Sequence, residues 1–159
     1  MDRLYQRHGP ALMLFARLYV ADGAAAEDAV HRVFVKLLGG HYIVEGSAAA
    51  YLYRAVKNEA LNDRRSRSRE IATGEERAWF SSDGPAKSET AIELQRALSA
   101  LPEEQRDVVV MRVWSGMTFE EVAEAMEVNI HTAASRYRYG LERLRERLTG
   151  GRKAEGQHR

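Results

Sequence analysis

Hydrophobic residues recur every three or four positions along most of the 159-residue chain, which is the spacing of one face of an α-helix. No stretch alternates between apolar and polar residues in the manner of a strand. In the first half, the apolar stripes predict three helices, at about 4–22, 26–38 and 48–65. Gly39 and Gly40 end the second stripe, and a short loop leads to the third. Three helices with short connections predict a small bundle over residues 1–65.

The segment 66–88 carries no sustained apolar stripe and is rich in serine and glycine, so it predicts a flexible linker. Helical periodicity resumes near Glu89. Pro102 suits the first position of a further helix, whose positive end is favoured by Glu103 and Glu104. The predicted fold is therefore all-α: a three-helix bundle and a four-helix domain over residues 89–148, joined by the linker. We expect the basic tail, residues 149–159, to be disordered.

A helix-turn-helix is predicted over residues 117–148. Thr118 and Glu121 form a capping box at the start of a short helix, and Asn129 is a good N-cap for the helix that follows. The apolar positions of the second helix point inward, which leaves a polar outer face near its start. That face consists of His131, Thr132, Ala134, Ser135, Arg136, Arg138 and Tyr139. A recognition helix enters the major groove by such an end, although an ordinary helical hairpin with a polar face has the same pattern.

Charge is segregated along the chain, although 24 basic residues nearly balance 23 acidic ones. Residues 54–69 carry a net charge of +4, residues 99–128 a net charge of −5, and residues 130–159 a net charge of +5. Two basic blocks far apart in sequence suit a polyanion that is held at two places, but solvated helix faces rich in arginine would look the same.

Composition narrows the function further. The absence of cysteine excludes disulfide scaffolds, thiolate zinc sites and cysteine nucleophiles. No apolar run reaches the roughly 18 to 20 residues of a membrane span, and the N-terminus lacks the order of a secretory signal, so we expect a cytoplasmic protein. The histidines share no metal-ligand spacing, and neither a Ser/His/Asp set nor a phosphate-binding loop is present. We therefore expect no enzyme activity, no catalytic residue, no metal and no cofactor.

Three patches resemble the extracytoplasmic-function (ECF) group of bacterial RNA polymerase sigma factors, which keep regions 2 and 4 of the sigma-70 family. Residues 26–34, AEDAVHRVF, resemble the helix by which that family docks on polymerase. Residues 51–58, YLYRAVKN, with Asp63, Arg64 and Arg65, resemble the helix that reads the minus-ten element. Residues 101–106, LPEEQR, with the helix-turn-helix, resemble region 4, which binds the minus-thirty-five element.

The resemblance implies a promoter-specificity factor with region 2 at residues 1–65 and region 4 at residues 89–148. Its implied partners are the clamp coiled coil of the largest polymerase subunit, the flap of the second largest, double- and single-stranded promoter DNA, and an anti-sigma factor. The implied polymerase contacts are Glu27, Asp28, Val30, His31 and Phe34. The implied minus-ten contacts are Tyr42, Arg54, Lys57, Asn58, Asp63, Arg64 and Arg65. The outer face of the recognition helix is implied to read the minus-thirty-five element.

The alternative is a stand-alone helix-turn-helix regulator, which would normally dimerise to reach two half-sites and would leave the N-terminal bundle without a role. The sequence also departs from the family pattern. His31 and Arg32 replace the usual Gln-Glu at the expected polymerase contact. Ala134 and Tyr139 stand where basic residues are frequent, and Gly140 replaces an alanine. We therefore expect an unusual preference in the minus-thirty-five element.

Overall fold

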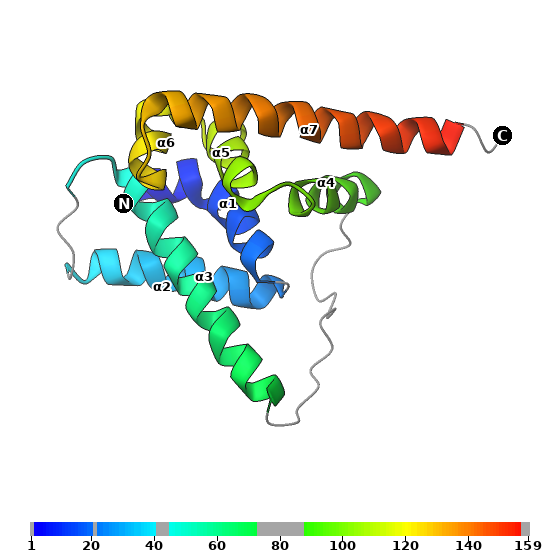
Figure 1. Ribbon diagram of the computed structural model, residues 1–159. Coiled ribbons are helices and arrows are strands. Elements are labelled where there is room, and N and C mark those ends of the chain that lie inside the picture. The colour runs from blue at the N-terminus through cyan, green and yellow to red at the C-terminus, as the bar shows by residue number, and fades with distance from the viewer. Residues whose placement is uncertain (1, 21, 41–44, 73–87, 157–159) are drawn as a thin grey trace.

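The computed structural model describes residues 2–20, 22–40, 45–72 and 88–156, and every regular element in these ranges is a helix (Figure 1). The N-terminal bundle consists of α1 (Asp2–Tyr19), α2 (Gly23–Leu38) and α3 (Ala48–Ala72). The C-terminal bundle consists of α4 (Glu89–Ser99), α5 (Glu103–Val113), α6 (Phe119–Met126) and α7 (Ile130–Gly156). The predicted fold class, three helices followed by four, is confirmed.

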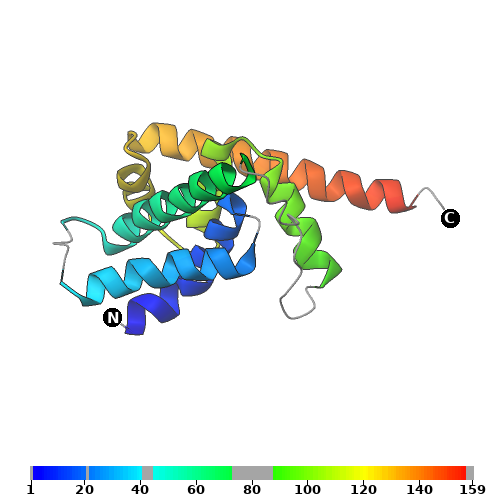
Figure 2. The same ribbon diagram turned by 90° about the horizontal axis from the view of Figure 1, so that it is seen from below.

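Aromatic rings fill the centre of the N-terminal bundle. The ring of Phe15 on α1 meets Tyr53 of α3 edge to face, with 4.8 Å between centroids, and meets Tyr19 at 5.3 Å. All three residues are buried, and such edge-to-face contacts add to the free energy gained by removing the rings from water. Figure 2 shows α2 and α3 running alongside each other, with α1 next to them. Asp22 caps α2 by accepting from the Ala24 N–H at 3.0 Å.

Two helices run further than the sequence predicts. α3 continues past Arg65 to Ala72, and Arg67 holds this extension against α2 by bonding its N-cap carboxylate, Asp22, at 3.3 Å. Residues 66–72, which the sequence analysis assigned to the linker, are therefore helical, and the remaining linker residues, 73–87, lie outside the described ranges. α7 continues to Gly156, so the tail expected to be disordered is helical over 149–156. Its glycines disfavour a helix by about 1 kcal/mol each without preventing one.

The start of α5 also differs by one position. Pro102 is the N-cap residue and Glu103 is the first helical residue, whereas the sequence suggested Pro102 for that place. Pro102 has no N–H to donate, and its carbonyl accepts from Gln105 and Arg106 at 3.0 and 2.9 Å. Glu103 and Glu104 occupy the first turn, where their charge favours the positive end of the helix.

The two bundles are packed together, and their apolar side chains form one continuous buried core. α3 lies against α6, and α1 lies against α4 and α5, while α7 runs along the far side of the C-terminal bundle (Figure 1). The sequence predicted two tethered modules and gave no indication of this packing.

Two classes of site receive no support within the described ranges. No helix there is long and apolar enough to cross a membrane. The same ranges hold no group of three or more His, Cys, Asp or Glu side chains arranged to bind a metal ion.

Candidate nucleic-acid interface

The helix-turn-helix consists of α6, a tight turn and the start of α7. Thr118 and Glu121 form the complete capping box: the Glu121 N–H donates to Thr118 Oγ1 at 3.1 Å, and the Thr118 N–H donates to Glu121 Oε2 at 2.9 Å. Asn129 caps α7 by accepting from the Thr132 N–H at 2.8 Å. Both predicted caps are confirmed. Glu127 makes the turn with a left-handed backbone, φ 55°.

Two contacts inside the C-terminal bundle fix the direction of α7. The Arg112 guanidinium lies 4.2 Å from the centroid of the Phe119 ring and 5.5 Å from that of Tyr137, and it donates to the Met117 carbonyl at 2.6 Å. It therefore ties α5 to both helices of the motif. At Gly140, α5 approaches so closely that a Cβ would lie 2.9 Å from Val109 Cγ2 and 3.0 Å from the Gln105 carbonyl oxygen.

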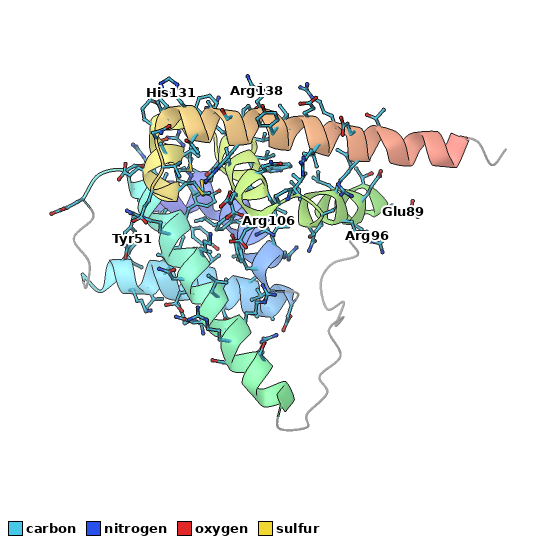
Figure 3. All side chains as sticks on the ribbon, viewed as in Figure 1. Tyr51, Glu89, Arg96, Arg106, His131 and Arg138 are labelled. Atoms are coloured by element: carbon cyan, nitrogen blue, oxygen red, sulfur yellow. The ribbon has the colours of Figure 1, made fainter. Side chains whose placement is uncertain are left out.

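The start of α7 carries the seven residues predicted to contact the minus-thirty-five element. His131, Ser135, Arg138 and Tyr139 are exposed, and His131 and Arg138 project from the side of α7 that faces away from the other helices (Figure 3). Thr132, Ala134 and Arg136 are half-buried, and Arg136 pairs with Glu104 at 3.5 Å. The Arg138 guanidinium lies 5.1 Å from the Tyr139 ring centroid. An imidazole, a hydroxyl and a guanidinium along one helix edge have the donors that base edges and phosphates accept.

A second basic surface follows one side of α3. At 3.6 residues per turn, Arg54, Lys57, Asn58, Arg64 and Arg65 fall within about a third of the helix circumference. Asn58, Arg64 and Arg65 are exposed, and Arg54 and Lys57 are half-buried. A hollow of about 340 Å³ lies at the C-terminal part of this side, lined by Leu61, Arg64, Arg65 and Ser68. We call this the basic side of α3.

Asp63 lies on the opposite side of α3 and faces α2. Its carboxylate pairs with Arg32 at 2.5 Å, and the same guanidinium lies 3.2 Å from Glu59, which also pairs with Lys36. Asp63, one of the predicted minus-ten contacts, is thus held by an ion pair within the N-terminal bundle. The pairing also accounts for Arg32, whose positive charge replaces an acid of the family pattern and is met by two acids of α3.

The predicted polymerase contacts divide between the surface of α2 and the core. Glu27, Asp28 and His31 are exposed, while Val30 and Phe34 are buried and orient the helix. Val35 and Leu38 are also exposed, at 59% and 66%, and extend the same surface by one and two turns. Sequence reasoning did not single out these two residues, although exposed apolar side chains are a signal of an interaction surface. Tyr42, the remaining predicted site residue, lies outside the described residues.

The contact between the bundles includes a buried polar cluster. The Tyr19 hydroxyl of α1 donates to the fully buried Asp107 of α5, which also accepts from Arg106 at 3.2 Å and from Lys57 at 3.4 Å. Burial raises the pKa of Asp107, and these donors counteract the rise. Burial and the Asp107 charge raise the pKa of Tyr19, so its hydroxyl keeps its proton. Arg106 lies over the Tyr19 ring, 4.6 Å from its centroid, in the interior of the molecule (Figure 3).

Two known families match the chain in order. The family model described as Sigma-70 region 2 matches residues 4–70, and the one described as Sigma-70, region 4 matches residues 91–144. The ECF RNA polymerase sigma factor SigM of Mycobacterium tuberculosis is 32% identical over 152 residues, covering 94% of this chain and 76% of SigM. The RNA polymerase sigma-E factor of Streptomyces coelicolor is 32% identical over 145 residues, covering 87% of this chain and 80% of that protein.

Two solved structures have a similar fold. One is the sigma factor RpoE in complex with the anti-sigma factor NepR from Bartonella quintana, with a TM-score of 0.66 at 24% identity, covering 94% of this chain and 98% of that one. The other is CnrH in complex with the cytosolic domain of CnrY, with a TM-score of 0.64 at 21% identity, covering 94% of this chain and 87% of that one. At these identities the likeness supports the fold.

Proposed function

The chain belongs to the ECF group of RNA polymerase sigma factors. We propose that it binds bacterial RNA polymerase core and directs the polymerase to promoters whose minus-ten and minus-thirty-five elements this chain recognises. One observation carries the proposal: each family-matched half of the chain presents a helix side with exposed cationic and hydrogen-bonding side chains, α3 in the first and the start of α7 in the second. A factor that grips one polyanion at two places needs both surfaces.

For the minus-thirty-five element, α7 enters the major groove by its N-terminal end. His131, Ser135 and Arg138 face the base edges, and an arginine that bonds a guanine with both N–H groups discriminates strongly against other bases. Thr132, Ala134 and Tyr139 line the same groove. Arg136 gives up its ion pair with Glu104 and contacts the adjoining phosphate backbone.

For the minus-ten element, the basic side of α3 follows the DNA. Arg54, Lys57, Arg64 and Arg65 bind phosphates, and Asn58 bonds a base edge or a phosphate. Asp63 acts through its pairing with Arg32, which fixes α3 against α2. Tyr42 stacks on an unpaired base of the melted strand. The free energy for unstacking comes from these contacts, because the sequence contains no loop for nucleotide hydrolysis.

The exposed surface of α2, with Glu27, Asp28 and His31, docks on the clamp coiled coil of the largest polymerase subunit. Val30 and Phe34 support that surface from the core. The C-terminal bundle meets the flap of the second largest subunit. The protein works in the cytoplasm, where the polymerase is, and has no catalytic centre or cofactor of its own.

An anti-sigma factor is a further proposed partner. Both of the similar solved structures are described as complexes, one with the anti-sigma factor NepR and the other with the cytosolic domain of CnrY. A protein that covers the DNA-contacting surfaces of this chain would prevent initiation.

Run-off transcription on fragmented genomic DNA with purified core polymerase tests the proposed function. We expect discrete start sites that depend on the added chain, and Arg138→Ala should lower their yield by about tenfold, since a good base contact is worth about 1–3 kcal/mol. Arg143→Ala is the matched control: Arg143 is an exposed arginine on α7, about 140° further around the helix. It should change the yield by less than about twofold.

The same experiment separates the proposal from the alternative. A stand-alone regulator would bind a palindromic site as a dimer without polymerase and would direct no initiation. As a control, the core polymerase must initiate correctly with its housekeeping sigma factor. If the same polymerase initiates transcription at no specific site when this chain is added, the proposed function is wrong.

A further inference from the structure

Acidic side chains of the C-terminal bundle cover part of the basic side of α3. Four of them, which we call the closing carboxylates, come from α5, α6 and the turn after α6: Glu103, Asp107, Glu124 and Glu127. They belong to the acidic block between two basic blocks that the sequence displays. Their positions relative to α3 are the basis of the inference.

The first contact lies at the N-terminus of α3. The Ser47 N–H donates to Glu124, with its nitrogen 3.0 Å from Oε1 and 3.3 Å from Oε2, and Ser47 Oγ donates to Glu121 at 3.3 Å. Gly46 makes room for this carboxylate, because a Cβ at that position would overlap Glu124 Oε1, and its φ of +81° also favours glycine. A carboxylate here takes the place that helix N-termini offer to phosphates.

The other contacts lie along the middle of α3. Lys57 Nζ is 3.1 Å from Glu103 Oε1 and 3.4 Å from Asp107 Oδ2, and Arg54 Nη1 is 3.7 Å from Glu127 Oε1. Both cations are assigned to DNA phosphates in the proposed function. Further along α3, Arg64 and Arg65 remain exposed.

The reading face of α7 is not involved in this packing. His131, Ser135, Arg138 and Tyr139 are exposed while the bundles are in contact, and His131 and Arg138 point away from α3 (Figure 3). The two proposed DNA surfaces therefore differ in accessibility.

We infer that this packed arrangement is a self-inhibited state, in which the closing carboxylates occupy the phosphate contacts of Arg54 and Lys57 and the N-terminus of α3, and leave the reading face of α7 free. The inference rests on the proposed function for the identity of the competing polyanion. The carboxylates and the minus-ten strand then bind α3 in mutually exclusive ways, and the bundles must separate before the minus-ten element is engaged. Double-stranded DNA still reaches α7 in the closed state.

A reversible crosslink between the bundles tests the inference directly. His8 of α1 and Ser115 after α5 touch across the contact, with Nδ1 2.6 Å from Oγ, and neither is placed in DNA binding. Because the chain has no cysteine, His8→Cys with Ser115→Cys provides the only thiols, which a short bis-methanethiosulfonate reagent can bridge. The probes are a fluorescent 15-nucleotide single strand and a 20-base-pair duplex, both of pooled random sequence, since phosphate contacts do not depend on sequence.

We expect the bridged protein to bind the single strand about tenfold more weakly than the same protein after reduction, since several ion pairs of modest strength must be exchanged. Binding of the duplex should differ by less than about twofold. Single-cysteine variants treated with the reagent serve as controls. Equal affinity of bridged and reduced protein for the single strand would overturn the inference.

Charge removal provides a second, independent measurement. Glu103→Gln, Glu124→Gln and Glu127→Gln together should raise affinity for the single strand about fivefold. The matched control replaces three exposed acids of the same bundle outside the contact, Glu120, Glu142 and Glu146, with glutamine. If both triple variants bind the single strand with equal affinity, the increase in affinity comes from the change in net charge alone, and the inference fails. Because these assays contain no polymerase, a negative run-off experiment would overturn the proposed function without deciding this one.

Discussion

Gly140 shows how a residue that weakens a helix can be required by its surroundings. A glycine inside a helix costs about 0.5–1 kcal/mol relative to alanine, and the sequence alone presents it as a loss. In the fold, α5 passes so close to α7 at this point that both a side chain and a backbone oxygen of α5 lie within 3.0 Å of where a Cβ would be. The close approach of the two helices therefore depends on the missing side chain.

We expect Gly140→Ala to lower the free energy of unfolding by about 1–2 kcal/mol, because the cost of overpacking exceeds the gain in helix propensity. Gly150→Ala is the matched control, since Gly150 also lies in α7 but has nothing within 4 Å of its Cβ position. That change should be neutral or stabilise the protein by up to about 1 kcal/mol. Urea denaturation of both variants measures the difference, and the same sign for both would contradict the close-approach explanation.

Residue-level features were predictable from sequence where both partners are near each other in the chain. The capping box of Thr118 and Glu121 and the cap by Asn129 each join residues three apart. Tyr19 and Asp107, by contrast, are 88 positions apart, and each sits in an apolar stripe where no local pattern reveals its partner. The available signal was an acid directly before the apolar run 108–111.

At the scale of elements, α2 has one face buried in the core and another face exposed to solvent. Val30 and Phe34 are buried on the first, and Glu27, Asp28 and His31 stand on the second. Exposed Val35 and Leu38 continue the second face. A mixed apolar and charged surface of this kind is suited to a protein partner.

We expect Glu27→Lys with Asp28→Lys to abolish co-purification with core polymerase, because two attractive charges become repulsive at the proposed contact. The protein should remain folded, since both side chains are exposed. Glu89→Lys with Glu93→Lys on α4 reverses two exposed acids elsewhere and should leave co-purification unchanged. Retention of polymerase by the α2 variant would exclude this docking surface.

Helix ends were the least predictable part of the elements. Serines after Arg65 suggested a linker, yet Arg67 continues α3 by pairing with Asp22 of α2. The basic tail after Leu148 was expected to be disordered, yet α7 continues to Gly156. Apolar periodicity defines the middle of a helix well, whereas its end depends on single contacts and small propensity differences.

At the scale of the whole molecule, the sequence predicted two modules and missed their packing. Contacts such as Tyr19 with Asp107 and Lys57 with Glu103 join residues that no motif connects. The segregation of acidic and basic blocks was visible, and the fold brings part of the acidic block onto the basic side of α3. Charge pattern indicated that something anionic binds there, but it could not indicate that the chain itself does.

The contact between the bundles should weaken as pH falls below 6.5. Burial, followed by the nearby charge of Arg7, lowers the pKa of His8 from its usual value of 6.5. The stability contributed by neutral His8 is therefore complete above pH 6.5 and is lost as the pH falls through the lowered pKa, by at most about 1.4 kcal/mol per pH unit. We expect His8→Gln to reduce the loss of unfolding free energy between pH 7.5 and 5.5. Denaturation profiles that fall equally in both proteins would contradict this assignment.

The turn between α6 and α7 combines an unfavourable backbone conformation with a contact to the opposite bundle. Glu127 holds a left-handed backbone that glycine or asparagine adopts at less expense, and its side chain reaches Arg54 on α3. A glycine at this position would suit the backbone better, but it would also remove the carboxylate that reaches Arg54. One side chain thus belongs both to the bend of the helix-turn-helix and to the contact between the bundles.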